Sequence, residues 1–281
     1  MMRRTRMSKN RNLSGFVTFL ILAVVFVGSG YLIGKYLLAS LLQRPPEGQP
    51  VSGNQPEPPT GGETTTTTVE ISTKPLTLYR VQLGAFSTKE RAENTAQMAI
   101  DKGVPAGVMS PDPLYKVYCG VTSSKEAAQK LAQNALPKLS GIVGEDDNLY
   151  VATMEIDSCS FSLTGNQNVV QEIQKAFSTI DNAIASLIGF WDQYYLEQQI
   201  SINLASMKSD IATVKTALDQ ITPDSGTQAA HGVALALATE LENAIGAAIQ
   251  TQGGDGSGTV QGMTSVIKII DAYAHDLKAL Q

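Results

Sequence analysis

The chain has 281 residues, of which 43% are hydrophobic, so wholesale disorder is excluded and one large or two small folded domains are expected. Its formal net charge of −5 is unevenly distributed. Six of the 21 basic residues precede Gln43 and all 26 acidic residues follow it. The chain from residue 43 onward therefore carries a net charge of −11. An acidic body repels polyanions, and nucleic acid is therefore not expected as a partner. The two cysteines and two histidines lie far apart, which argues against a four-ligand zinc site, and no cofactor is expected.

The first 12 residues form a basic tail with five cations and no acid. They lead into Leu13 to Gly34, 22 residues without a formal charge, which is about the length that crosses a hydrocarbon core of roughly 30 Å. We predict a transmembrane helix over residues 13–42 that crosses the cell (inner) membrane once. The N-terminus is expected in the cytoplasm, because basic residues that flank a membrane helix are enriched on the cytoplasmic side. The lipid bilayer is then one partner, and the rest of the chain is extracytoplasmic. A cleaved signal peptide is the alternative, although 22 residues are long for its apolar region.

Residues 43–75 contain seven of the twelve prolines, several glycines and the run Thr64 to Thr68, with almost no large apolar side chain. A segment of this composition cannot bury a core, so we predict a disordered linker.

The next stretch contains an internal repeat. When Tyr79 to Ile100 is aligned with Tyr115 to Leu136, at an offset of 36, ten of 22 positions are identical. Each copy reads as an alternating strand that ends at a glycine, followed by a Ser-Thr or Ser-Ser pair that can cap a helix. Short apolar runs follow each helix at residues 106–109 and 149–154. The resulting order, β-α-β-β-α-β, predicts a ferredoxin-like domain over residues 76–156, with a four-stranded antiparallel sheet, both helices on one face and the other face open.

Alternation predicts which side chains look out of the open face. Tyr79, Val81 and Leu83 share the helix side with Tyr115, Val117 and Cys119, because these are the larger apolar positions. The residues expected on the open face are Arg80, Gln82, Lys116 and Tyr118. An amide, two cations and a phenol suit an extended ligand that is rich in hydroxyls and anionic groups. The alternative is an ordinary solvated face of a half-buried sheet.

The segment Tyr79-Arg80-Val81-Gln82-Leu83-Gly84-Ala85-Phe86, the helix after it and the second copy resemble the SPOR (sporulation-related repeat) domain. This resemblance implies a small sheet-and-helix domain that binds peptidoglycan, with a preference for glycan strands stripped of stem peptides. By motif position it implies Gln82, Ala85 and Lys116 as glycan-binding residues. This chain departs from the family at two positions: several members have serine where this chain has Ala85, and an aromatic residue where it has Leu114. From the residues alone we expect Tyr118 to supply the ring that stacks on a sugar. We also expect Arg80 and Lys116 to neutralise the lactyl carboxylate of a glycan strand without stem peptides.

Residues 157–281 are predicted to be all-helical. A heptad-like seam runs from Val170 to Tyr194, changes phase near Glu197 to Ser201, and resumes from Leu204 to Ile221. Two further helices are expected at about residues 228–250 and around Met263 to Leu277. Two alternatives stay open: the chain folds back near Glu197 and buries the stripes within one monomer, or residues 165–281 self-associate or bind a helical partner. The second is favoured, because the membrane tether raises the local concentration of the chain. A continuous helix would also need a second chain to cover it.

The sequence favours a membrane-tethered, non-catalytic protein that binds peptidoglycan in cell division, sporulation or wall remodelling. The alternative is a structural protein whose helical domain is the functional part, with the sheet domain serving only for targeting. An enzyme is not favoured, because neither histidine has an acidic partner at ligand spacing and neither cysteine has a nucleophile context. A disulfide between Cys119 and Cys159 is left open.

Overall fold

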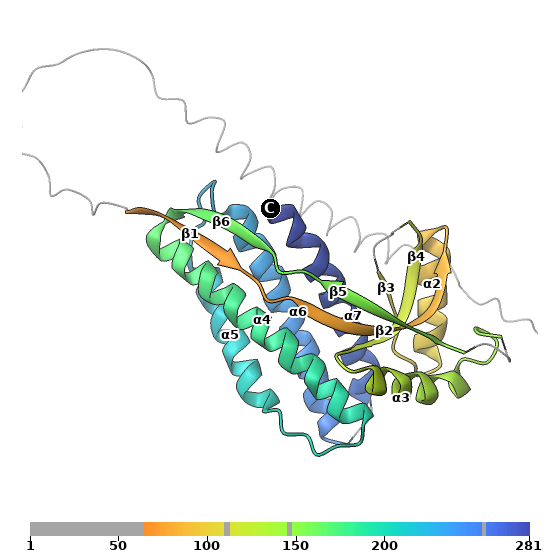
Figure 1. The fold of residues 1–281 in the computed structure, drawn as a ribbon. Coiled ribbons are helices and arrows are strands. Elements are labelled where there is room, and N and C mark those ends of the chain that lie inside the picture. The colour runs from red at the N-terminus through yellow and green to blue at the C-terminus, as the bar shows by residue number, and fades with distance from the viewer. Residues whose placement is uncertain (1–64, 110–112, 145–147, 255–256) are drawn as a thin grey trace, which may run out of the picture. The chain divides into compact units, whose positions relative to one another are not determined.

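The computed structural model describes residues 65–109, 113–144, 148–254 and 257–281. The basic tail, the predicted transmembrane helix and most of the predicted linker lie outside these residues. Residues 62–281 form one compact unit of mixed helix and sheet (Figure 1).

The internal repeat forms the expected split arrangement. Its elements, in chain order, are β2 (Leu76–Phe86), α2 (Lys89–Asp101), β3 (Gly107–Met109), β4 (Tyr115–Thr122), α3 (Lys125–Ala135), a 3-10 turn η1 (Leu136–Lys138) and β5 (Tyr150–Ile156). Within the described residues the strands pair antiparallel in the order β3-β4-β2-β5, which confirms the predicted topology. The predicted caps are also confirmed, because the hydroxyls of Thr88 and Ser124 accept hydrogen bonds from the backbone N–H groups of Arg91 and Ala127.

The C-terminal end of the predicted linker is ordered, and that part of the prediction is wrong. Residues Thr66–Ser72 form strand β1, which pairs antiparallel with β6 (Ser160–Asn166) in a two-stranded ribbon. Threonine suits a half-buried strand, and Ile71 is only 3% exposed, so the ribbon has an apolar side to bury. The ribbon packs on the first long helix, where Phe161 meets Phe177 edge-on with ring centroids 5.3 Å apart. The same ribbon shows that the region 157–281 is not entirely helical.

The remaining elements are α4 (Gln167–Tyr195), α5 (Leu204–Gln220), α6 (Gln228–Gln252), α7 (Ser257–Asp276) and a final 3-10 turn η2 (Lys278–Leu280). The phase change in the seam marks the end of α4, where Glu197 takes a left-handed conformation with φ of 53° and the chain turns back into α5. The structure therefore has the fold-back alternative, and the continuous helix is not formed. Association of residues 165–281 with a second copy or a helical partner stays a prediction, which rests on the effect of the predicted membrane tether on local concentration.

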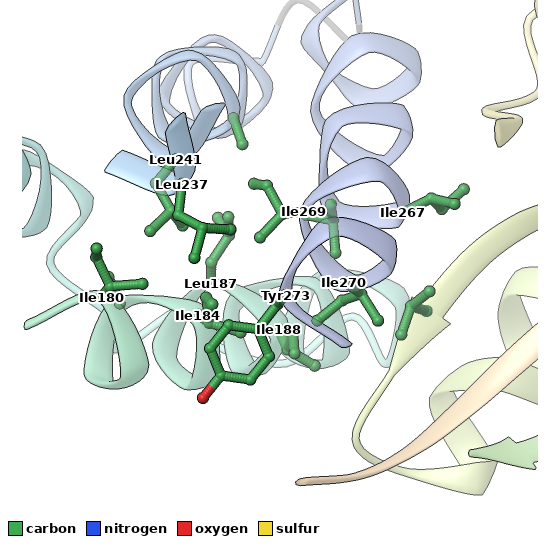
Figure 2. Close-up of a cluster of buried hydrophobic side chains, with 14 of the residues drawn as sticks. Ile180, Ile184, Leu187, Ile188, Leu237, Leu241, Ile267, Ile269, Ile270 and Tyr273 are labelled. Carbon is green, nitrogen blue, oxygen red and sulfur yellow. The ribbon is translucent and has the colours of Figure 1, made fainter. Parts of the chain in front are cut away.

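The predicted apolar stripes meet in the interior of the bundle (Figure 2). Ile184 and Leu187 on α4, Leu237 and Leu241 on α6, and Tyr273 on α7 are all almost completely buried. The bundle buries the apolar stripes of its helices against one another, as amphipathic helices require.

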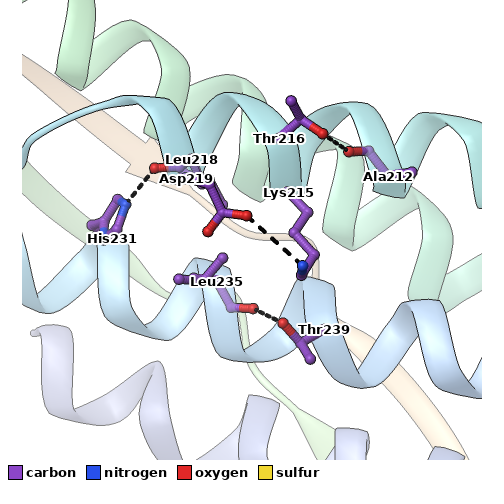
Figure 3. Close-up of polar contacts among 8 residues, drawn as sticks. All are labelled: Ala212, Lys215, Thr216, Leu218, Asp219, His231, Leu235 and Thr239. Atoms are coloured by element: carbon purple, nitrogen blue, oxygen red, sulfur yellow. Dashed lines mark hydrogen bonds and ion pairs between the residues drawn. The ribbon is translucent and has the colours of Figure 1, made fainter.

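One polar contact joins α5 to α6, and others lie within each helix (Figure 3). The Nε2 of His231 on α6 lies 2.9 Å from the carbonyl oxygen of Leu218, in the last turn of α5. Carbonyl groups in the last turn of a helix lack partners within the helix, so this contact gives His231 a structural role. Lys215 and Asp219 form a partly exposed ion pair along α5 at 3.8 Å.

By length and composition alone, α6 is apolar enough to cross a membrane. Its contacts with α4, α5 and α7 account for that composition, because a core helix is apolar on several sides.

Candidate functional site

Strand pairing places the five predicted site residues on one face of the sheet. Gln82 on β2 is the register partner of Tyr118 on β4, and Ala85 is the partner of Lys116. Residues that are directly opposite in a ladder point to the same face. The guanidinium of Arg80 lies over the ring of Tyr118, 4.6 Å from its centroid, and therefore shares that face.

Two irregularities in the β2–β4 ladder make this arrangement possible. The register shifts between Val81 and Gln82 and again between Gln82 and Gly84, so Leu83 has no partner in the ladder. In a regular strand Gln82 and Ala85 would point to opposite faces, because their separation is an odd number of residues. The bulge at Leu83 changes this parity and brings both to the same face. Alternation alone could not predict that placement.

The sequence analysis predicted that this face is open. That prediction is wrong, because α7 covers part of the face. This helix contacts β3 and β4. A Cβ atom built on Gly107, the register partner of Tyr118, would lie 2.8 Å from Cγ2 of Ile267 on α7. The backbone N–H of Val121 on β4 lies 3.4 Å from the Sδ of Met263. The internal repeat contains no information about α7, so the prediction of an open face had no way to include it.

Tyr118 is therefore a buried residue and not a sugar platform. Its side chain is 1% exposed, and its hydroxyl has no hydrogen-bond partner among the described residues. Burial raises the pKa of the Tyr118 phenol, the Arg80 guanidinium lowers it, and the Asp271 carboxylate on α7 raises it. The ring supports Arg80, whose Nη1 lies 3.5 Å from the Sδ of Met109.

Part of the face remains accessible, and we call it the β2–β5 strip. It consists of Arg80, Gln82, Ala85, Lys116 and Tyr150. Ala85 and Tyr150 are exposed, and the other three are half-buried. Tyr150 begins the edge strand β5, is 66% exposed, and is the register partner of Gln82 on the side away from Tyr118.

Sequence reasoning missed Tyr150. The strand after the second helix was predicted over residues 149–154, but its register against β2 was not, and register decides which of its side chains lies beside Gln82. An aromatic residue at the start of a predicted edge strand was the available signal.

Both cysteines are free and buried, so the disulfide left open above is not formed. The Sγ of Cys119 lies 3.5 Å from the carbonyl of Val81, and that of Cys159 lies 3.2 Å from the carbonyl of Leu277. Burial raises the pKa of the Cys119 thiol to about 12, so this sulfur stays protonated and is a poor nucleophile.

Comparison with protein families detects a SPOR domain at residues 75–144, about a quarter of the chain. SPOR domains are extracytoplasmic, non-catalytic domains that bind peptidoglycan. Strand β5 lies beyond the matched residues but completes the same sheet. Searches of curated proteins and of solved structures find no match for the chain.

Proposed function

We propose that this protein binds peptidoglycan glycan strands, preferentially strands without stem peptides, through the β2–β5 strip of its SPOR domain. The observation that carries the proposal is the pairing of Gln82 with Tyr150 on the accessible part of the sheet face. The protein acts outside the cytoplasm, tethered to the membrane by residues 13–42, in cell division, sporulation or wall remodelling.

The chemistry of the strip suits a sugar chain. The Gln82 amide can donate to and accept from sugar hydroxyls or N-acetyl groups. The exposed ring of Tyr150 offers an apolar surface for a pyranose face and a phenol that can hydrogen-bond at its edge. Arg80 and Lys116 supply two positive charges beside them. A glycan strand without stem peptides carries lactyl carboxylates, and these cations would pair with them.

The test is co-sedimentation of the full chain, in detergent, with sacculi that are intact or treated with an amidase. We expect more protein in the pellet with treated sacculi. Replacing Gln82 or Tyr150 by Ala should reduce the bound fraction about threefold to tenfold, because each removes a direct contact worth roughly 1 kcal/mol. The unfolding temperature should change little, since Tyr150 is exposed and Gln82 is only half-buried.

The matched control is Thr153→Ala. Thr153 is exposed on the same strand as Tyr150, but it is the register partner of Tyr79 and lies on the opposite face. This variant should bind as the wild type does. Equal sedimentation with intact and treated sacculi would remove the preference for bare strands. Equally weakened binding in all three variants would mean that the strip is not the binding surface.

A further inference from the structure

The SPOR sheet face meets a helix that the family motif does not contain. Thr264, Ile267 and Asp271 follow one side of α7 at helical spacing. The hydroxyl of Thr264 accepts a hydrogen bond from the N–H of Ala106 at 3.2 Å, and Ile267 lies against Gly107. Asp271 is one turn further along the same side, which brings it toward Tyr118, the register partner of Gly107. Its carboxylate acts on the Tyr118 phenol, in agreement with this placement.

The helix that carries these residues is anchored on both sides. Ile267 points away from Leu237 and Leu241, toward the strands, while other apolar residues of α7 face the bundle (Figure 2). Met263, Val266, Ile267, Ile269 and Ile270 are at most 2% exposed. Beyond them, the hydroxyl of Tyr273 donates to Asp181 on α4 at 2.6 Å. Separating α7 from the sheet would expose apolar surface on the helix and on the strands, and would break the hydrogen bond between Ala106 and Thr264.

Arg80 links the covered and accessible parts of the face. Its guanidinium lies over the buried ring of Tyr118, yet the residue is half-exposed and contributes to the β2–β5 strip. Arg80 is one of the two cations expected to pair with a glycan carboxylate. Asp271 therefore places a negative charge on the helix beside it. At a partly solvated site such a charge weakens the attraction of a second anion.

We propose that α7 is a fixed wall of the glycan-binding site, which confines the strand to the β2–β5 strip and uses Asp271 to limit its affinity for anionic sugars. The inference rests on the proposed function and specifies how the site is bounded. Recognition then depends on the Gln82 and Tyr150 contacts more than on net charge.

A disulfide tests whether the wall is fixed. A Cβ atom built on Gly107 would lie 3.2 Å from the Cβ of Ile267, close to the roughly 3.5–4.5 Å that a disulfide requires. The full chain with Gly107→Cys and Ile267→Cys is oxidised, and peptide mass mapping confirms the new link against pairing with Cys119 or Cys159. We expect the oxidised and reduced forms to sediment equally with amidase-treated sacculi. Loss of binding on oxidation, restored by a reductant, would show that α7 must leave, and would overturn the fixed wall while leaving the proposed function intact.

Substitution of Asp271 tests the charge. Asp271→Asn should increase binding to amidase-treated sacculi about two- to fivefold at low salt, and the gain should shrink as salt is added. Binding to N-acetylglucosamine oligomers, which have no carboxylate, should stay the same. The control is Asp276→Asn, which removes the same charge from α7 but lies about 140° around the helix from Asp271.

The outcomes separate the two levels of the argument. Equal binding by wild type and Asp271→Asn, or an equal gain in Asp276→Asn, would overturn the role of Asp271 and leave the proposed function standing. Absence of binding by the wild type itself would overturn the proposed function and this inference with it.

Discussion

Asp181 on α4 connects three separate parts of the chain. One carboxylate oxygen accepts the Tyr273 hydroxyl from α7 at 2.6 Å, and the other accepts the N–H of Lys74, between β1 and β2, at 3.1 Å. Burial raises the pKa of the Asp181 carboxyl, and its hydrogen bonds with Tyr273 and Lys74 oppose this effect. The pKa of Asp192, which accepts hydrogen bonds from Ser123 before α3, is raised for the same main reason. Asp181 and Asp192 are thus buried carboxylates, and each joins segments that are distant in the sequence.

The raised pKa of Asp181 predicts a pH dependence of stability. Between the unfolded-state pKa, about 3.9, and the higher folded-state value, the folded protein binds more protons than the unfolded one. The contribution of Asp181 is thus complete below that window and is lost as pH rises through the folded-state pKa. Urea unfolding at a series of pH values should show this slope, and Asp181→Asn should flatten it.

The Tyr273→Phe variant gives the opposite expectation. The hydrogen bond from Tyr273 lowers the pKa of Asp181, so its removal should raise that pKa and extend the slope to higher pH. Superimposable pH profiles for wild type and both variants would contradict the assignment of this slope to Asp181.

At the scale of elements, α6 and α7 are in close backbone contact at the start of α7. A Cβ atom built on Gly258, in the first turn of α7, would lie 2.2 Å from the backbone oxygen of Ala247 and 2.9 Å from the backbone nitrogen of Thr251. Backbone atoms of a packed helix cannot move aside as a side chain can, so glycine is required here for the close contact.

We therefore predict that Gly258→Ala destabilises the protein by about 1–3 kcal/mol, because the added methyl group separates the two helices. Gly232→Ala on the exposed side of α6 is the matched control, since a Cβ atom there meets nothing within 4 Å. It should stabilise the protein by about 0.5–1 kcal/mol through helix propensity. Chemical denaturation of both variants measures the difference, and similar effects of the two substitutions would contradict the close contact.

At the scale of the whole molecule, the sheet and the helical bundle share one core. Buried residues form a continuous cluster from Ile71 on β1 to Leu277 after α7. In that cluster α7 contributes to both the bundle and the covered face of the sheet. A SPOR fragment over residues 76–156 would leave Val121, Met109 and Tyr118 exposed where α7 now covers them.

A shared core predicts one cooperative unfolding transition for residues 62–281, the compact unit. Tryptophan fluorescence, which reports on Trp191 in α4, and far-ultraviolet circular dichroism should report the same midpoint. The fragment 76–156 should unfold at a midpoint at least about 10 °C lower, because each large apolar side chain that α7 no longer shields from water costs roughly 1.5–3 kcal/mol. Two separated transitions in the intact unit would show that the sheet and the bundle are independent.

The local features of this protein could be predicted from its sequence because they depend on neighbouring residues. The repeat at an offset of 36 residues predicted the strands and helices of the sheet domain, since alternation and capping are local signals. The same signals located α6, α7 and the phase change that ends α4. The motif around Gln82 resembles the SPOR domain, and this family is the one that the comparison detects at residues 75–144.

The tertiary structure alone decided which of these surfaces remain accessible. Thr66–Ser72 has too little apolar character to form a strand by itself, and β6, almost 100 residues away, pairs with it. Tyr118 alternates like an exposed residue, but α7 covers it, while Tyr150 is accessible beside Gln82. Periodicity specifies which face of an element is apolar, whereas exposure depends on which distant element packs there. A contact between β4 and a helix more than 130 residues later leaves no local pattern in either segment, so the β2–β5 strip could be located only in the folded molecule.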